Sequence, residues 1–306
     1  MIPIPPYSPL LRAALMMSLS AILFGCMAVV IRLASAELHA FEIAFFRNLF
    51  GLVFALPILL RHGVRILHTQ MLRFYLMRCL IGIFSMLAGF WAIVNLPLAQ
   101  AVAISYSTPL FVTIGAVLIL GEVVRIRRWS AVIVGFAGVL ILLRPGADTF
   151  TAGALIALLA AALSAAVAIS IKFLTRTEKP DTIVLYTTII WVPMSLFPAL
   201  LYWRTPTGMT WLWIVAAGGF GTLAHMLWTR ALRLSDASAI TPISFVQLPF
   251  IAVAAYYLFG EPLDRWTITG SVVILAANIY IARRELQIAR RAVTDPEIGR
   301  DAQVGR

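Results

Sequence analysis

One arginine lies inside an apolar stretch of the chain, where its charge needs an explanation. Arg47 falls in the stretch from about 41 to 60. A guanidinium inside a membrane span costs about 2.5–3.5 kcal/mol on insertion scales, so it needs an anionic partner or a hydrated cavity. Two interpretations stay open: Arg47 binds a substrate, or it forms an ion pair with Glu37 or Glu42 at the end of its helix. Glu42 and Arg47 are separated by about 140° around a helix, which makes a direct pair awkward.

One histidine, His225, also falls inside an apolar stretch, whereas the other three lie between stretches. An imidazole titrates near neutral pH, so it can carry a proton or hydrogen-bond to a polar substrate. A histidine that only packs is the alternative. Because no aspartate lies deep in an apolar stretch, any proton coupling would depend on His225 or Glu42.

The chain lacks the residue sets that common catalytic and metal sites require. It has no HExxH motif, and its two cysteines, Cys26 and Cys79, both fall in apolar stretches. Neither of the two lysines, Lys172 and Lys179, follows a glycine-rich loop, which excludes a P-loop ATPase. We therefore expect no catalytic residue, no metal and no cofactor. An intramembrane enzyme acting on lipid or peptide is the remote alternative.

The composition indicates that these residues are carried by helices in a lipid bilayer. Hydrophobic residues make up 61% of the chain and charged residues 12%, with a mean hydropathy of +0.95. A helix needs about 20 apolar residues to cross the hydrocarbon core. The sequence predicts an all-α membrane protein with ten transmembrane helices, at about 12–34, 41–60, 74–96, 98–120, 129–143, 152–174, 181–203, 210–232, 238–259 and 266–282.

The chain contains a diverged copy of itself. Between 82 and 104, nine of 23 residues recur 136 positions later, and Arg32 corresponds to Lys172 at an offset of 140. A unit of five spans enters on one side of the membrane and leaves on the other, so its copy must be inverted, as in secondary transporters. We expect a leader (1–11), two inverted five-helix repeats (12–146 and 147–283) and a basic tail (284–306).

The charge distribution predicts the orientation. The net charge is +11, and 19 of the 24 basic residues, Arg78 among them, fall in loops or ends on the side of the amino terminus. This bias predicts that both termini are cytoplasmic, and it explains the basic charge without a nucleic-acid partner.

Short motifs at matching places in the two halves carry a family resemblance. The chain resembles the EamA group of the drug/metabolite transporter superfamily over 12–285. The motifs are Leu120-Gly121-Glu122 before Trp129, Phe259-Gly260-Glu261 before Trp266, Arg47 itself, and Arg144-Pro145-Gly146. The resemblance implies a secondary transporter of the bacterial cytoplasmic (inner) membrane, a monomer or homodimer and not an enzyme. We favour a heteroaromatic vitamin such as riboflavin or an aromatic amino acid as substrate, with export of amino acids, drugs or other metabolites as the alternative.

The resemblance also implies a central cavity between the third, fourth, eighth and ninth spans. Aromatic walls with a few polar groups suit a flat or amphipathic solute. The candidates for substrate binding are therefore Arg47, Trp91, Tyr106, His225, Trp228 and Gln247. For each aromatic residue, ordinary packing is the alternative.

A second group of charged residues is expected to be structural. Glu122 and Glu261 close the fourth and ninth spans, where the helix dipole disfavours a negative charge. We expect cationic neighbours for them: Arg125, Arg127 or Arg128 for Glu122, and Arg265 for Glu261. Arg32, Lys172 and Glu42 complete this group. Anchoring is the favoured role, and gating by exchange of ion pairs is the alternative.

Overall fold

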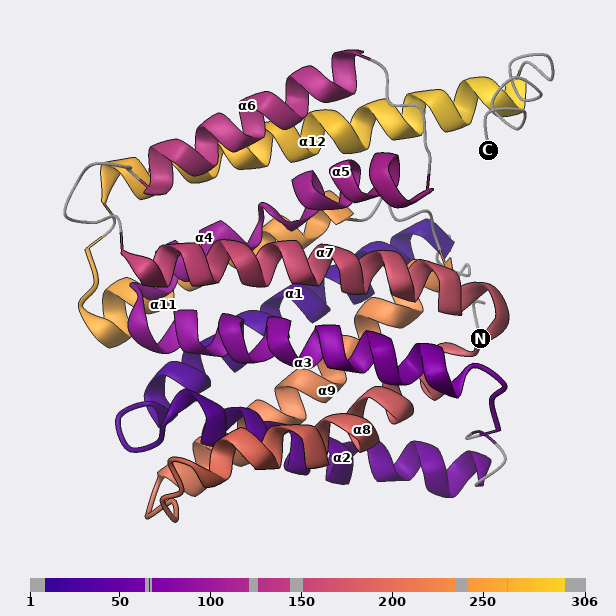
Figure 1. The fold of residues 1–306 in the computed structure, drawn as a ribbon. Helices are drawn as coiled ribbons and strands as arrows, with labels where there is room; N and C mark the ends of the chain where they lie inside the picture. Colours follow the sequence, from indigo (N-terminus) through magenta and orange to yellow (C-terminus); the bar gives the residue numbers. More distant parts are fainter. Residues whose placement is uncertain are drawn as a thin grey trace, which may run out of the picture.

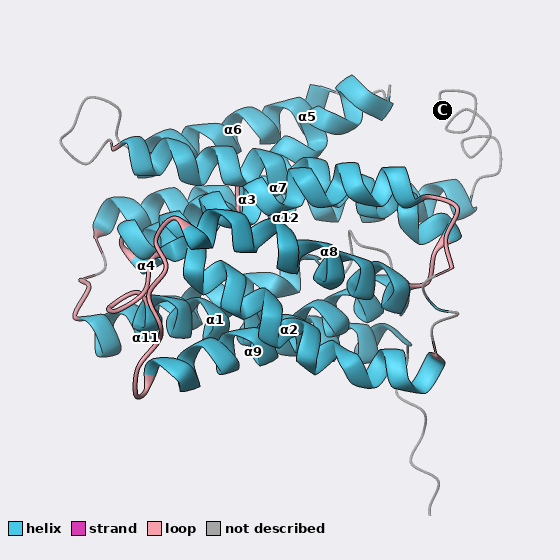
Figure 2. Ribbon diagram, turned by 60° about the horizontal axis from the view of Figure 1, so that its bottom comes forward, coloured by secondary structure: helices cyan, strands magenta, loops and turns pink. Residues whose placement is uncertain are grey.

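The computed structural model describes residues 9–63, 66, 68–120, 126–143, 151–234, 241–262 and 264–294, and for some of these, such as Lys172, only the backbone. Across those ranges the chain forms helices and no strands (Figures 1 and 2). The helices are α1 (Pro9–Ala34), α2 (Ala40–His62), α3 (Leu72–Asn95), α4 (Leu98–Ser105), α5 (Thr108–Leu120), α6 (Ile126–Leu143), α7 (Ala152–Thr177), α8 (Pro180–Leu200), α9 (Thr210–Leu234), the 3₁₀ helix η2 (Thr241–Val246), α11 (Gln247–Phe259) and α12 (Arg265–Thr294).

Seven segments of the described chain are long and apolar enough to cross a membrane. They are Leu11–Ala34, Ala40–Arg61, Leu72–Asn95, Leu98–Gly115, Ala152–Ile171, Asp181–Leu200 and Thr210–Ala231. Three shorter apolar helices, Trp129–Leu143, Ile243–Phe259 and Arg265–Ile281, fall where the sequence predicts the other spans. The expectation of an all-helical membrane protein is confirmed.

Side chains on α1 are arranged as lipid contact requires. Leu11, Leu15 and Leu19, spaced by four, are exposed along one face, whereas Ala21 and Ala28 are buried. The buried face packs along α9, where the hydroxyl of Ser20 donates to the carbonyl oxygen of Ala224 (2.8 Å). Small residues inside and large apolar residues outside are typical of helix packing in membranes.

Helices of the first half pack mainly on helices of the second. The closest pairings are α1 with α9, α3 with α7, α2 with α8, and α6 with α12, which lie side by side in Figure 1. The first turn of α1 and the last turn of α12 lie at the same end of the bundle (Figure 1). The two halves are thus interleaved and do not form separate bundles.

Two interrupted segments meet inside the bundle. The chain breaks between α4 and α5 at Tyr106, and the 3₁₀ helix η2 precedes α11. The Tyr106 hydroxyl donates to the carbonyl oxygen of Ser244 (2.8 Å) and to Gln247 Oε1 (3.2 Å), and Asn278 Nδ2 donates to the Tyr106 carbonyl (2.8 Å). Backbone groups freed by a break in a membrane helix need such partners, and here a carbonyl at each break accepts from a side chain of the other half.

Glycine allows α2 and α9 to approach closely. A Cβ atom added to Gly218 would lie 2.6 Å from Cβ of Phe50 and 2.9 Å from the backbone nitrogen of Gly51. Gly218→Ala is therefore expected to lower the free energy of unfolding by about 1–3 kcal/mol. A Cβ at Gly89 on α3 would meet nothing within 4 Å, so Gly89→Ala should be neutral or stabilising by up to about 1 kcal/mol. Thermal unfolding of both variants in detergent tests this, and equal losses would contradict it.

Candidate functional site

A cavity lies between α2, α3, α7, α8 and α9. It is lined by Arg47, Arg78, Ile171, Ile183, Val184, Thr187, Thr188, Trp191, Thr222, His225, Trp228 and Thr229. The cavity volume is about 30 Å³, which is enough for about two water molecules. A metabolite therefore needs the surrounding helices to separate before it can enter.

Arg47 projects from α2 into the lining of this cavity and is only 5% exposed. Its Nη1 donates to Asn48 Oδ1 (2.8 Å), and Asn48 Nδ2 donates to the hydroxyl of Ser195 on α8 (3.1 Å). Arg47 Nε has no acceptor. Among the described residues Arg47 forms no ion pair, so the alternative of a pair with Glu37 or Glu42 is wrong.

Arg78 is a second buried cation, which the sequence interpretation placed at a loop end. It lies within α3, is 4% exposed, and donates through Nη1 to the Thr187 hydroxyl on α8. Its Nε is also without an acceptor. The signal was present, because position 78 is inside the predicted span 74–96. The positive-inside rule assigns arginines near the end of a span to loops, so it does not identify this one as buried.

Three aromatic side chains, Trp191, His225 and Trp228, form part of the wall. His225 lies edge-to-face with Phe24 of α1 (5.0 Å between ring centroids) and with Trp228 (6.3 Å). Trp191 Nε1 donates to the backbone carbonyl of Cys79 (3.0 Å), which fixes its ring beside the arginines. The structure thus gathers Arg47, His225 and Trp228 from the predicted set. Their part in binding stays a prediction.

The other three predicted residues do not line this cavity. Tyr106 and Gln247 contact each other at the paired helix breaks. Trp91 packs on α7, where a Cβ at Gly153 would lie 3.0 Å from its ring. Their observed contacts are packing contacts and hydrogen bonds at the helix breaks.

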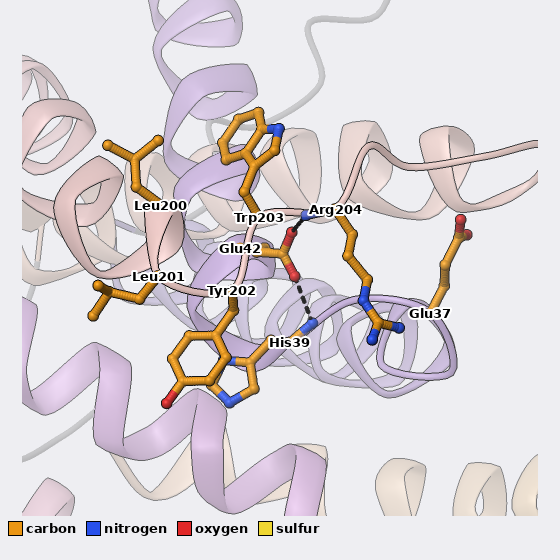
Figure 3. A pocket seen from close by; sticks show the side chains of 8 residues that line it. All are labelled: Glu37, His39, Glu42, Leu200, Leu201, Tyr202, Trp203 and Arg204. Carbon is orange, nitrogen blue, oxygen red and sulfur yellow. Dashed lines mark hydrogen bonds between the residues drawn. The ribbon is translucent and has the colours of Figure 1, made fainter.

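Glu42 caps a helix. Its carboxylate accepts from the backbone N–H of His39 (2.9 Å) and of Arg204, and with His39 it forms a capping box at the start of α2 (Figure 3). These bonds also tie the α8–α9 connection to α2. Neighbouring side chains enclose an open pocket of about 590 Å³, lined by Glu37, His39, Glu42, Leu200, Leu201, Tyr202, Trp203 and Arg204.

Two titratable groups in this open pocket have shifted pKa values. Hydrogen bonds from the side chains of Thr210 and Thr207 lower the pKa of Glu37, whose Oε1 accepts from the Thr207 hydroxyl at 2.7 Å. Burial lowers the pKa of His39, although the nearby Glu42 carboxylate opposes that effect. His39 is stacked on Tyr202 with 3.9 Å between centroids. These shifts favour the ionised form of Glu37 and the neutral form of His39.

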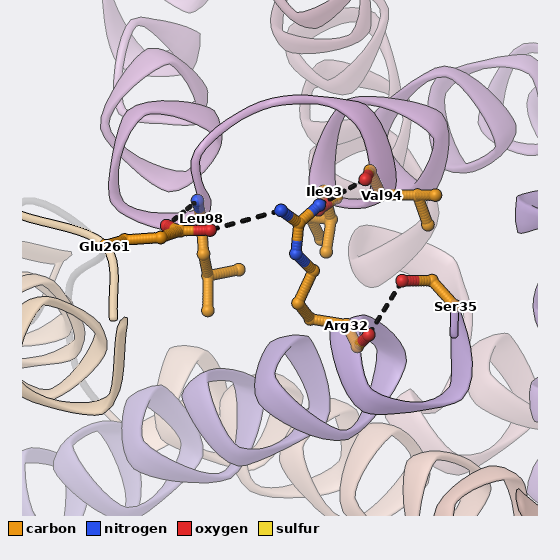
Figure 4. A network of polar contacts seen from close by, with 6 residues as sticks. All are labelled: Arg32, Ser35, Ile93, Val94, Leu98 and Glu261. Atoms are coloured by element: carbon orange, nitrogen blue, oxygen red, sulfur yellow. Dashed lines mark hydrogen bonds and ion pairs between the residues drawn. The ribbon is translucent and has the colours of Figure 1, made fainter. Parts of the chain in front are cut away.

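Glu261 has a cationic neighbour, but it is not the predicted one. Its Oε1 lies 3.1 Å from Nη2 of Arg32, and its Oε2 accepts from the backbone N–H of Leu98 (2.7 Å) (Figure 4). Arg32 also donates to the carbonyls of Ile93 (3.1 Å) and Val94. The prediction of Arg265 is wrong, because Gly260 ends α11 in the left-handed conformation (φ 62°) and the Glu261 side chain meets α1 and α4. Glu122 and the Lys172 side chain lie outside the described residues.

Comparisons with known proteins agree with this architecture. The sequence model of the EamA-like transporter family matches twice, at residues 11–144 and 151–283. An S-adenosylmethionine uptake transporter of Rickettsia bellii is 34% identical over 81% of this chain and 86% of its own length, and a riboflavin transporter of Vibrio cholerae is 31% identical over 92% and 96%. A pseudopaline exporter of Pseudomonas aeruginosa is 27% identical over 90% and 97%.

One solved structure matches over 89% of this chain and 98% of its own, with a TM-score of 0.65 and 18% identity, which shows a shared fold alone. The family matches cover both halves and nearly all of the described helices. Relatives that align over most of their length are transporters of small metabolites in bacteria. The chain belongs to the EamA-like transporter family.

Proposed function

We propose that the protein is a secondary transporter in which two inverted halves, 12–146 and 147–283, open the central cavity alternately to the two sides of the membrane. The double family match supports this division, as do the exchanged pairings α1 with α9 and α7 with α3. With ten spans both termini lie on one side, which the arginine bias assigns to the cytoplasm of a bacterial inner membrane. Either a monomer or a homodimer is compatible with this mechanism.

The observation that carries the proposal is the enclosed cavity with two buried arginines beside Trp191, Trp228 and His225. Cations buried in a membrane protein mark substrate pathways, and aromatic walls bind flat rings. The substrate we favour is a small heteroaromatic metabolite such as riboflavin or S-adenosylmethionine, as named for the relatives. Export of another metabolite is the second candidate, since one relative is an exporter.

Flux through purified protein in liposomes tests the proposal. Labelled riboflavin, S-adenosylmethionine and aromatic amino acids are offered from either side, with empty liposomes as the control. We expect saturable flux of one heteroaromatic compound in at least one direction. Flux that is not saturable, or no flux of any of the three classes, would contradict the proposal.

Substitution of a cavity residue should affect KM, whereas substitution of a residue that only packs should affect thermal stability. Trp228→Ala removes an aromatic wall and should raise KM about tenfold, the equivalent of one ring contact. Trp91→Ala leaves the cavity lining intact, so it should lower thermal stability without changing KM. An equal rise of KM in both variants would argue against this cavity as the binding site.

A further inference from the structure

Two guanidinium groups from different helices line one cavity without a counter-charge. Arg47 on α2 and Arg78 on α3 are 5% and 4% exposed. Neither forms an ion pair with any acidic residue in the part of the chain that the structure describes. Removing a charge from water is costly unless an opposite charge compensates, and two like charges in one cavity also repel. The unliganded site therefore carries uncompensated positive charge.

The surrounding polar groups orient the guanidinium groups without neutralising them. The acceptors are neutral: Asn48 Oδ1 for Arg47, and the Thr187 hydroxyl oxygen and Cys79 Sγ (3.9 Å) for Arg78. The hydroxyl hydrogens of Thr187 and Thr188 are used by carbonyls one turn earlier in α8, each at 2.7 Å. The Nε atoms of both arginines remain without acceptors. The site thus has an excess of N–H donors and lacks negative charge.

Glycine on α9 makes room for this arrangement. A Cβ atom at Gly221 would lie 2.6 Å from Nη2 and 2.7 Å from Nε of Arg47. The guanidinium is therefore packed against the α9 backbone, and the Asn48–Ser195 hydrogen bond fixes it from the side of α8. A side chain held this closely is preorganised for a ligand.

We propose that Arg47 and Arg78 together bind an oxyanion of the transported solute, a carboxylate or phosphate on a soluble metabolite. This inference rests on the proposed function, since it names the chemistry that the central cavity recognises. Of the substrates proposed above, S-adenosylmethionine and the aromatic amino acids carry a carboxylate, whereas riboflavin carries neither a carboxylate nor a phosphate, so the inference favours the first two. Guanidinium groups bind these anions through charge-assisted, commonly bidentate hydrogen bonds. The neighbouring rings of Trp191 and Trp228 would contact the remainder of the solute. A soluble anion is favoured over a lipid headgroup because the cavity lies between five helices and the two arginines that line it are almost fully buried.

Binding to the purified full chain in phosphatidylcholine nanodiscs tests the inference. Benzoate and phenyl phosphate serve as oxyanion probes, benzamide as the neutral control, and the thermal unfolding midpoint as the readout. We expect a saturable rise with the oxyanions and none with benzamide. Arg47→Gln and Arg78→Gln should each weaken binding at least tenfold. Arg73→Gln, an exposed arginine on α3, should bind as the wild type does.

The unliganded variants provide a second measurement. If the arginines are held for a ligand, Arg47→Gln and Arg78→Gln remove an uncompensated charge, so their midpoints should equal or exceed that of the wild type. Lower midpoints for both would mean that the arginines are structural, which overturns the inference. So would a lack of stabilisation by either oxyanion, or equal stabilisation by benzamide.

Lipid composition separates the two sources of an oxyanion. Adding phosphatidylglycerol to the nanodiscs should leave benzoate binding unchanged, whereas competition would identify a lipid headgroup as the occupant and overturn the inference. Binding and flux measurements distinguish a failure of this inference from a failure of the proposed function. Arginine-dependent binding without flux in liposomes would leave the anion site standing, and saturable flux that is insensitive to both arginines would refute the site alone.

Discussion

Replacing Arg47 with alanine should reduce transport at least about 30-fold in kcat/KM, because truncating one partner of a buried charge contact costs about 2–5 kcal/mol. Arg47 is the charged residue that α2 contributes to the cavity, and it is 5% exposed. Lysine should not restore activity, since a point charge cannot reproduce a planar guanidinium with several fixed donors. Initial rates of substrate flux in liposomes, corrected for protein incorporated, measure this effect. Normal flux would show that the arginine has no part in transport.

The location of the Arg47 guanidinium can be changed without replacing Arg47 itself. Gly221→Ala places a methyl group where the Arg47 guanidinium lies, and the flexible end of the side chain must move. We expect a rise in KM with little loss of stability. Gly219→Ala on the same helix is the matched control, because its Cβ would lie 3.2 Å from the Phe54 ring, away from the cavity lining. An unchanged KM in Gly221→Ala would show that the position of the guanidinium does not matter.

Glu261→Ala should lower the free energy of unfolding by about 2–3 kcal/mol. The change leaves the Arg32 guanidinium without its carboxylate and the Leu98 N–H without its acceptor. The two side chains are 24% and 18% exposed, so the effect should be below that of a fully buried pair. Unfolding titrations of the purified protein in mixed detergent micelles measure it.

Arg265 provides the control for that experiment. It is exposed at the start of α12, and it is the residue that sequence alone suggested as the partner of Glu261. Arg265→Gln should change stability by no more than about 0.5 kcal/mol. If Arg265→Gln is as harmful as Glu261→Ala, the Arg32 pairing is not the one that stabilises the protein.

The sequence predicted the elements more completely than the contacts between them. Hydropathy located the helices because the hydrocarbon core imposes a fixed length of apolar residues. It could not assign Arg32 to Glu261, since 229 residues separate them and the contact depends on how α1 meets the α11–α12 turn. Likewise, Arg47, His225 and Trp228 share a cavity because α2 packs on α8 and α9, and no local pattern contains that information.

Arg78 shows a different limitation. The positive-inside rule treats an arginine near a helix end as a loop residue, yet the α3 register turns this one toward Thr187. Conversely, Tyr106 and Gln247 are predicted to bind substrate because the family resemblance places their spans around a central cavity. Both are engaged at the helix breaks, and their part in binding stays a prediction. Residue type alone does not distinguish a ligand contact from a partner for the backbone.

The paired breaks at Tyr106 and Ser244 have a mechanical consequence. These hydrogen bonds join the two halves at the positions where the helical hydrogen bonding of each half is interrupted. Motion of one half against the other would therefore pivot here, with the largest displacements at the two membrane surfaces. Amide hydrogen exchange should then be slow around Ser107, although a break in a helix ordinarily exchanges quickly, and faster toward the helix ends.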